Sequence, residues 1–369
     1  MAVPKEKIAV VLPNHLGDVV MATPALRALR RGRPDAEITA VVRGSLVGAL
    51  RGAPWLDGFV PHDIYKRRGK LAQLRERMRV AREIRGSDCV LVLPNSFASA
   101  LLAFLARAKQ RVGYARRGRS VLLTDAVPPP RERGSGARAI IGRGKFKPTA
   151  MERYYLELAR RLGAPDLGTQ IELFREPDAE RECDSLFASH GLGARPLVCL
   201  APGAGFGPSK LWPLEYVAEL ARSLRADGAD VALVHGPGEQ SLADEIAARA
   251  GVPLAMLGGD RMTLSLLKSV VARAQLLVCN DAGARHIAAA FEVRTLVLMG
   301  PTAVGYTNLN LKRTKLMREP VECSPCQLKV CPIDHRCMTR LLPARVLGEA
   351  RAALTRPDWQ GSVELELAT

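Results

Sequence analysis

One stretch past the middle of the chain constrains the fold most: an apolar run, Leu197–Ala201, opens into a loop with three glycines before a helix begins. The loop reads Pro202-Gly-Ala-Gly-Phe-Gly-Pro-Ser-Lys-Leu-Trp-Pro213. Further apolar runs are followed in the same way by residues 280–286 and 300–302. Because the carboxyl ends of parallel strands meet at one sheet edge, we expect the three loops to converge on one nucleotide-binding crevice. Glycine lets the backbone approach a phosphate, and helix amides bind its charge.

Strand-like and helix-like patterns alternate along the whole chain, which predicts βαβ units and parallel sheets. The sequence therefore indicates an α/β protein with two Rossmann-like domains facing each other. The expected strands are 7–12, 37–42, 88–93, 197–201, 230–235, 275–279 and 294–299. The expected helices are 18–31, 71–84, 97–106, 149–162, 214–225, 239–250, 263–274, 283–291 and 343–354.

The length of 369 residues suggests two domains of ~150 residues each. A linker around residues 163–177 sets the expected boundaries: a first domain at 1–175 and a second at 176–342. A helix and tail at 343–369 are expected to pack back onto the first domain. Residues 128–148, rich in proline, glycine and basic side chains, are expected to form a mobile basic loop.

The charge is unevenly distributed. Residues 1–175 carry 33 Lys and Arg against 15 Asp and Glu, whereas the remainder carries 21 against 22. This asymmetry indicates a polyanionic partner for the first half, such as nucleic acid, an anionic membrane or an acidic glycolipid, although an ordinary basic surface explains it equally well. The chain has no apolar run of ~18 residues and no secretory leader at its start. We therefore expect a cytoplasmic protein.

Asp18 follows the first expected strand, with Gly17 turning the chain just before it. An aspartate at a helix start is commonly a cap that suits the helix dipole. A carboxylate at this sheet edge is also placed to act as a general base. His15 either assists this carboxylate or faces solvent.

The loops at 202–213 and 280–286 carry further candidates. Lys210 is placed to pair with a phosphate, although a surface lysine is the simpler interpretation. The Walker A spacing is absent, which argues against P-loop ATP hydrolysis. Gly283 frees the first amides of its helix for an anion. Asp281 and His286 either contact a ligand or serve as a cap and an ordinary core residue.

Four cysteines cluster near the end of the chain. Their spacing suits a tetrahedral zinc site, with His335 as an alternative ligand; free thiols or oxidised pairs are the other interpretations. The clustered residues are Cys323, Cys326, Cys331 and Cys337. By contrast, Cys89, Cys199 and Cys279 lie in apolar runs and are most simply core residues.

The chain resembles the heptosyltransferases of glycosyltransferase family 9 nearly from end to end, and it is most similar to the branch that adds the second heptose of the lipopolysaccharide core. The resemblance rests on five motifs. They are Leu16-Gly-Asp-Val-Val-Met-Ala-Thr-Pro-Ala-Leu26, Met151-Glu-Arg-Tyr-Tyr155, the loop at 202–213, Asn280-Asp-Ala-Gly-Ala-Arg-His-Ile-Ala-Ala-Ala290 and Gly300-Pro-Thr302.

The resemblance implies a GT-B fold and an inverting transfer from ADP-heptose to a Kdo-bearing lipid A whose core carries the first heptose. It implies Asp18 as the general base, Lys210 at the diphosphate, Glu239 at the ribose and Met262 at the adenine, and it requires no metal. The remaining nucleotide-sugar contacts it implies are Gly203, Gly205, Asp281, Ala282, Gly283 and His286.

Two departures from the family pattern fall in the loop at 280–286. The family usually has Ser or Thr where Ala282 stands, so one hydroxyl donor to the phosphate is missing. Ala284-Arg285 replaces a commoner apolar pair, so Arg285 brings a charge beside the donor. Both departures bear on the identity of the sugar donor more than on the fold.

The basic first half then has a candidate partner, because Kdo carboxylates, lipid A phosphates and the inner leaflet are all anionic. The expected acceptor contacts are His15, Lys66, Arg67, Arg68, Arg116, Arg117 and Arg119. We expect a monomer that associates peripherally with the inner face of the inner membrane. A sugar-nucleotide epimerase of the same fold and a basic polyanion-binding protein are the alternatives. Few aromatic residues and no recognised motif argue against nucleic acid.

Overall fold

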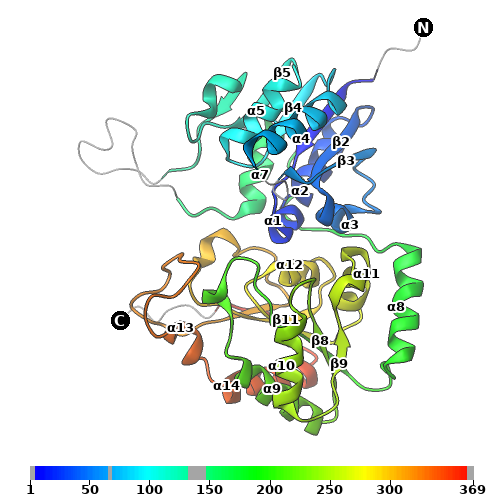
Figure 1. Cartoon of the computed structure of the whole chain (residues 1–369), viewed down its shortest axis with the longest axis vertical. Helices are drawn as coiled ribbons and strands as arrows, with labels where there is room; N and C mark the ends of the chain where they lie inside the picture. The colour runs from blue at the N-terminus through cyan, green and yellow to red at the C-terminus, as the bar shows by residue number, and fades with distance from the viewer. Residues whose placement is uncertain (1–4, 65–68, 132–146, 364–369) are drawn as a thin grey trace. The chain divides into compact units, whose positions relative to one another are not determined.

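The computed structural model describes residues 5–64, 69–131 and 147–363. The chain forms two compact units (Figure 1). Unit 1 contains residues 1–170 and 305–307, and unit 2 contains residues 171–304 and 308–369. In the part of the chain that is described, no helix is long and apolar enough to cross a membrane.

Unit 1 is built on a parallel sheet with the strand order β3-β2-β1-β4-β5-β6. Placing the first strand beside the fourth is the Rossmann arrangement, and it creates the point where the strand order reverses. The strands are β1 Lys7–Val11, β2 Glu37–Arg43, β3 Gly58–His62, β4 Cys89–Val92, β5 Gln110–Tyr114 and β6 Asp125–Val127. The sequence did not indicate β3, whose Pro61 is tolerated because the strand lies at the sheet edge.

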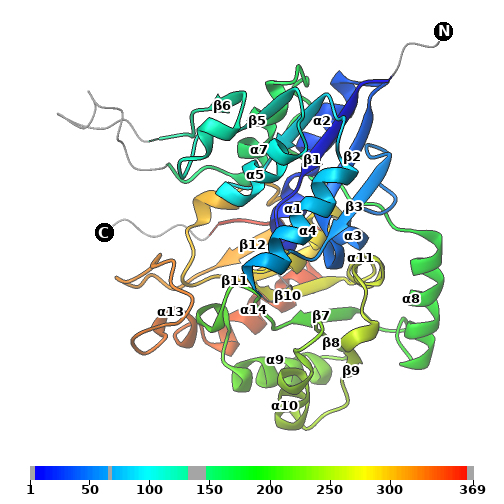
Figure 2. The ribbon, with the colours of Figure 1, turned by 45° about the horizontal axis from the view of Figure 1, so that its top comes forward.

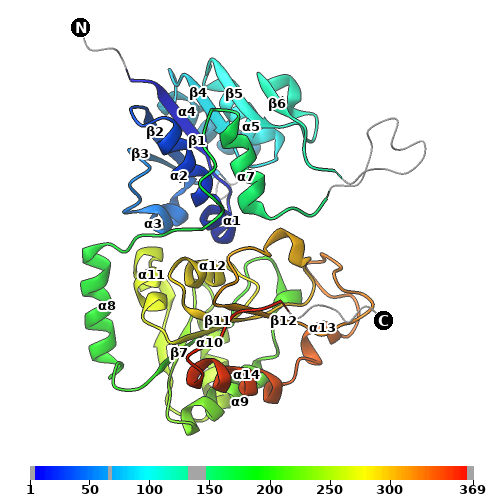
Figure 3. The same ribbon diagram turned by 180° about the vertical axis from the view of Figure 1, so that it is seen from behind.

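Helices cover both faces of this sheet (Figures 1 and 3). Helix α2 packs against α7 on one face, while α4 and α5 pack together on the other. The helical elements are α1 Leu16–Met21, α2 Thr23–Gly32, η1 Gly44–Leu46, α3 Val47–Leu50, α4 Lys70–Glu83, α5 Phe97–Leu105, η3 Arg119–Leu122 and α7 Met151–Arg160.

The single helix expected over residues 18–31 is in fact two helices, α1 and α2, which meet at Ala22. Pro24 has no N–H to continue the hydrogen-bond ladder, and it stands in the first turn of α2, where no such donor is needed. The Thr23 hydroxyl donates instead to the carbonyl of Val20, at 2.8 Å. The break lets α1 present Asp18 independently of the longer helix.

Unit 2 repeats the same topology, with a parallel sheet in the order β12-β11-β10-β7-β8-β9 (Figure 2). Strands β7 and β10 flank the point where its strand order reverses. The strands are β7 Leu197–Ala201, β8 Asp230–Val234, β9 Ala255–Leu257, β10 Leu276–Asn280, β11 Arg294–Leu298 and β12 Thr314–Met317.

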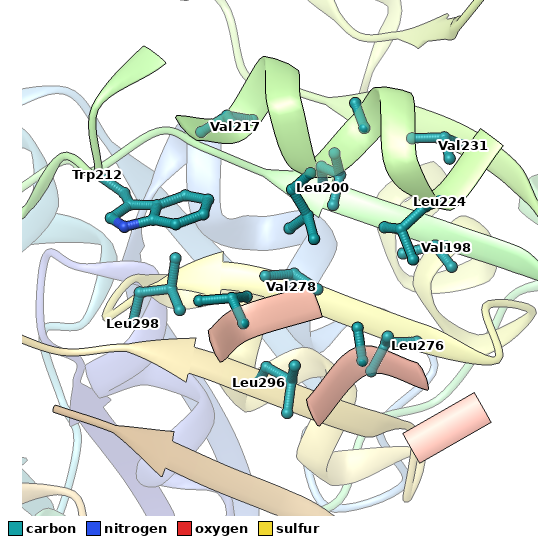
Figure 4. Packing of buried hydrophobic residues seen from close by; sticks show 14 of the residues in the cluster. Val198, Leu200, Trp212, Val217, Leu224, Val231, Leu276, Val278, Leu296 and Leu298 are labelled. Atoms are coloured by element: carbon teal, nitrogen blue, oxygen red, sulfur yellow. The ribbon is translucent and has the colours of Figure 1, made fainter. Parts of the chain in front are cut away.

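The core of unit 2 lies between this sheet and helices α9, α10 and α14 (Figure 4). Trp212, 2% exposed, is the largest fully buried side chain, and its indole N–H donates to the Leu341 carbonyl at 2.8 Å. Helices α8 and α11 pack together, as do α11 and α12. The helical elements are α8 Pro177–Ser189, η4 Pro208–Lys210, α9 Leu214–Ala226, α10 Gln240–Ala250, η5 Gly259–Arg261, α11 Leu264–Ala272, α12 Gly283–Ala290, α13 Arg336–Thr339 and α14 Pro343–Thr355. The short helix η6 Val304–Tyr306 spans the division, because residues 305–307 are assigned to unit 1.

The last helix is placed differently from the expectation. Helix α14 belongs to unit 2, where it packs on α9, rather than returning to unit 1 (Figure 3). The reason is its apolar face: Val346, Ala350 and Ala353 are all buried in the core beneath the unit 2 sheet.

Candidate active site

The three loops of unit 2 converge at the carboxyl ends of its strands, as the sequence predicted. The Asn280 amide donates to the Pro202 carbonyl at 2.5 Å, which ties the β10 loop to the β7 loop. Lys210 and Thr302 both reach Asp281, which brings in the third loop. The meeting point lies where the strand order reverses, the position at which open α/β sheets bind ligands.

A buried ionic cluster forms the centre of this meeting point. Lys210 Nζ lies 2.6 Å from Asp281 Oδ2 and also donates to the Asp281 carbonyl at 2.8 Å. Arg285 donates to Oδ1 at 2.9 Å, and the Thr302 hydroxyl donates to Oδ2 at 2.7 Å. Both cations and the carboxylate are buried. Two positive charges thus face one negative charge, so the cluster is suited to a further anion.

The same neighbours fix the ionisation of Asp281. Burial by itself raises the pKa of this carboxyl group, but the charges of Arg285 and Lys210 and the hydrogen bonds from Lys210 and Thr302 outweigh burial. The pKa of Asp281 is therefore held well below its usual range. The carboxylate stays ionised at any physiological pH.

Helix α12 begins beside this cluster. Its N-cap residue, Ala282, offers no side-chain oxygen to the first-turn amides, which is the structural consequence of the departure noted in the sequence. His286 lies one turn inside the helix and is 7% exposed. Burial, followed by the charge of Arg285, lowers the pKa of His286 to about 3. The imidazole is therefore neutral at physiological pH.

Glu239 lies close to the glycine loop. Its carboxylate accepts the Gly236 N–H at 2.8 Å. A side chain at position 203 would collide with this carboxylate, so Gly203 makes room for Glu239. A Cβ built at Gly205 would meet no neighbouring atom, so a ligand has room to approach the backbone at this position. Met262 is buried and follows the short helix η5.

In unit 1, Asp18 occupies the first turn of α1, and the exposed His15 is the N-cap. The hydroxyl of Tyr155, on α7, is hydrogen-bonded to the Asp18 carboxylate. Burial first, and then the charge of Asp18, raises the pKa of Tyr155 well above its usual value. The phenol therefore remains a hydrogen-bond donor and orients the carboxylate. Tyr155 was not among the expected site residues, although it ends the Met151-Glu-Arg-Tyr-Tyr155 motif.

The expectation that Arg119 contacts an acceptor at the surface is wrong, because this side chain is 0% exposed. Its guanidinium donates to the carbonyls of Pro94 and Tyr114 and to the Ser99 hydroxyl, so it joins the loops after β4 and β5. Arg116 is half-buried and hydrogen-bonded to Tyr154. The expected contacts Lys66, Arg67 and Arg68, and most of the basic segment 128–148, lie outside the described residues. Arg117 is exposed.

The arrangement of the four clustered cysteines gives no support to the zinc site suggested by their spacing, which stays a prediction. Within residues 5–64, 69–131 and 147–363, no three His, Cys, Asp or Glu side chains are grouped as metal ligands. The loop is shaped instead by its contacts with the β7 loop: the Ser209 N–H and hydroxyl donate to the carbonyls of Lys329 and Leu328. Burial, then the neighbouring cysteines, raises the pKa of Cys337 to about 11, so it remains a thiol.

Comparison with known proteins agrees with this geometry. The family model of glycosyltransferase family 9 (heptosyltransferase) matches residues 77–336. The chain is 27% identical over 363 residues to lipopolysaccharide heptosyltransferase 2 of Escherichia coli K12, covering 95% of this chain and 99% of that protein. It is 29% identical over 307 residues to the corresponding protein of Salmonella typhimurium, covering 82% and 84%.

Solved structures share the fold. The ADP-heptose lps heptosyltransferase II of Escherichia coli superposes with a TM-score of 0.74 at 24% identity, covering 96% of this chain and all of that one. A glycosyl transferase family 9 structure from Veillonella parvula gives 0.78 at 20% identity, covering 96% and 98%. The match of the family model to more than half of the chain sets aside the epimerase and polyanion-binding alternatives. The chain therefore belongs to glycosyltransferase family 9 and is a glycosyltransferase with the GT-B type of α/β fold.

Proposed function

We propose that this chain transfers a heptose from ADP-heptose to the inner core of lipopolysaccharide. The observation that carries the proposal is the Lys210–Asp281–Arg285 cluster beside the start of α12, in a chain of family 9. Cations and helix amides at this sheet position suit a diphosphate. The names of the relatives, which describe heptosyltransferases acting on lipopolysaccharide, support the sugar and the acceptor.

In the proposed reaction, Asp18 removes the proton from the acceptor hydroxyl as that oxygen attacks the anomeric carbon of the heptose. The bond between this carbon and the phosphate oxygen breaks, and the configuration inverts. ADP leaves with the electron pair of the broken bond. Lys210 and the first amides of α12 stabilise the charge that develops on the diphosphate, an electrostatic effect that needs no rearrangement during the reaction.

The anionic acceptor also accounts for the charge asymmetry of the chain. The excess of Lys and Arg over Asp and Glu lies entirely within residues 1–175. Lipid A phosphates and Kdo carboxylates attract such a surface at the cytoplasmic face of the inner membrane. We propose that the enzyme works there as a peripheral protein and that Arg116 and Arg117 contribute to the attraction.

The decisive experiment combines ligand binding with turnover. ADP should raise the melting temperature of the chain, whereas UDP should not, because a ligand stabilises only the state that binds it. Mass spectrometry should detect one added heptose on a truncated core acceptor supplied with ADP-heptose. Stabilisation by UDP and no product from ADP-heptose would refute the proposed donor.

Asp18→Asn is expected to lower kcat by ~10²–10⁴-fold with ADP affinity almost unchanged, because general-base catalysis contributes about this much. Tyr155→Phe should cause a smaller loss of kcat, since the carboxylate loses the phenol hydrogen bond that orients it. Asp35→Asn, at an exposed acid of unit 1, serves as the control. Full activity of Asp18→Asn would exclude Asp18 as the base.

A further inference from the structure

Helix α5 has a composition that its position on the surface does not explain. Its sequence, Phe97-Ala-Ser-Ala-Leu-Leu-Ala-Phe-Leu105, contains no charged residue, and one side packs into the core through residues such as Leu102 and Ala103. The opposite side should be polar, yet Phe97 and Phe104 are each 47% exposed. A helix that is apolar all round is normally covered on every side, by protein or by lipid.

The neighbouring elements extend this exposed apolar surface. Helix α4 packs against α5, and it exposes Leu71 and Leu74, at 63% and 42%. The short helix η3 also packs against α5, and its Val121 is 82% exposed. We call this surface the α4–α5–η3 face; α4 and α5 can be followed in Figure 1. Single exposed apolar residues are common, but five large ones on three contiguous elements indicate an interaction site.

Positive charge borders the same face. The segment 70–85, which contains α4, has six basic side chains against two acidic ones, Glu76 and Glu83, and Glu76 is buried. The Arg111 guanidinium lies 5.7 Å from the centre of the Phe104 ring, so a cation also adjoins the apolar part. The basic residues of the segment are Lys70, Arg75, Arg77, Arg79, Arg82 and Arg85.

Exposed leucine and phenylalanine flanked by arginine suit the interface of an anionic membrane, where apolar side chains enter the acyl boundary and cations meet the headgroups. A second copy of the chain suits this face poorly, because a symmetric contact would bring two copies of the same basic segment into one interface. We propose that the α4–α5–η3 face docks unit 1 on an anionic lipid surface. This proposal refines the membrane association suggested above, but it does not depend on which sugar is transferred.

The test measures co-sedimentation of the full chain with vesicles of phosphatidylglycerol and phosphatidylcholine, with neither donor nor acceptor present. Leu74→Gln/Phe104→Gln should weaken binding at least tenfold at low and at high salt, because two apolar anchors are lost. Arg75→Glu/Arg82→Glu should weaken binding at low salt and flatten its salt dependence, since screening acts only on the charges. A melting curve of each variant verifies its fold.

Two matched pairs serve as controls. Leu167→Gln/Leu342→Gln removes two exposed leucines outside the face, and Arg181→Glu/Arg356→Glu reverses two exposed charges of unit 2. Both pairs should bind vesicles nearly as the parent chain does. The proposal fails if the control pairs lose as much binding as the face variants, or if Leu74→Gln/Phe104→Gln binds like the parent. It also fails if the parent chain does not bind vesicles and forms a dimer that Leu74→Gln/Phe104→Gln dissociates. Because no sugar is present, none of these outcomes reflects on the transferase proposal.

Discussion

At the scale of single residues, the site of unit 2 depends on the hydrogen bonds that the Asp281 carboxylate accepts. Its carboxylate accepts from Lys210, Arg285 and Thr302, so Lys210 is not the only cation that neutralises it. If Lys210 moves to bind a diphosphate, Arg285 stays with the buried carboxylate. A buried charge left without a partner would be costly. Arg285, the residue that departs from the family pattern, thereby frees Lys210 for the donor.

This arrangement predicts the effect of Arg285→Met. Asp281 would then hold Lys210 as its only cation, and the diphosphate would have to compete for it. We expect the Kd for ADP to rise about tenfold, equivalent to about 1.4 kcal/mol, as measured by calorimetry. Lys210→Met, the comparison variant, should lose more affinity than Arg285→Met. Unchanged or tighter ADP binding by Arg285→Met would contradict this role.

At the scale of elements, one tryptophan joins the donor loop to the core. Trp212 follows η4, which carries Lys210, and packs with α9 and the sheet strands in Figure 4. Its ring meets Tyr216 edge to face, and its N–H is bonded to the Leu341 carbonyl. The position of η4 relative to the sheet therefore depends on a large buried anchor.

Trp212→Ala should lower the free energy of unfolding by about 4 kcal/mol, because it deletes a large buried side chain and leaves a cavity. The urea midpoint measures this loss. Trp212→Phe, which keeps most of the volume and loses the hydrogen bond, should cost clearly less. Equal midpoints for Trp212→Ala and the parent chain would show that the anchor is dispensable.

At the scale of the whole molecule, both units bury a histidine that is held neutral. Burial lowers the pKa of His62 in unit 1, and burial together with the charge of Arg285 lowers the pKa of His286 in unit 2 to about 3. The unfolded chain takes up these protons near pH 6.5, where the folded chain does not. Stability is therefore complete above pH 6.5 and falls as the pH drops towards the folded pKa.

Lowering the pH from 7 to 5 should cost about 2 kcal/mol of unfolding free energy through His286 alone. Urea titrations at several pH values measure this slope. His286→Gln should remove this part of the pH dependence, whereas His190→Gln, at an exposed position, should retain it. An unchanged slope in His286→Gln would mean that His286 is protonated in the folded chain.

Much of this protein was predictable from local sequence. The spacing of apolar residues predicted the long buried strands and the helices, because an element buried on one or both faces carries apolar residues at a regular spacing. The glycine loop and residues 280–286 were correctly expected to meet, since parallel strands direct all their carboxyl ends to one edge. The break between α1 and α2 was missed, although Pro24 and Thr23 together explain it.

Other features depended on contacts between residues far apart in the chain. The tertiary packing buries Arg119 instead of leaving it at the surface. It also decides that α14 packs on α9. The hydrogen bond from Tyr155 to Asp18 joins positions 137 residues apart. Among the described residues the four clustered cysteines form no group of metal ligands, and their segment is hydrogen-bonded to Ser209 of the β7 loop. The sequence by itself determined which apolar runs form buried strands and where loops follow them, since both depend on local pattern. Only the tertiary structure decided which charged side chains are buried and which side chains become partners, since both depend on packing.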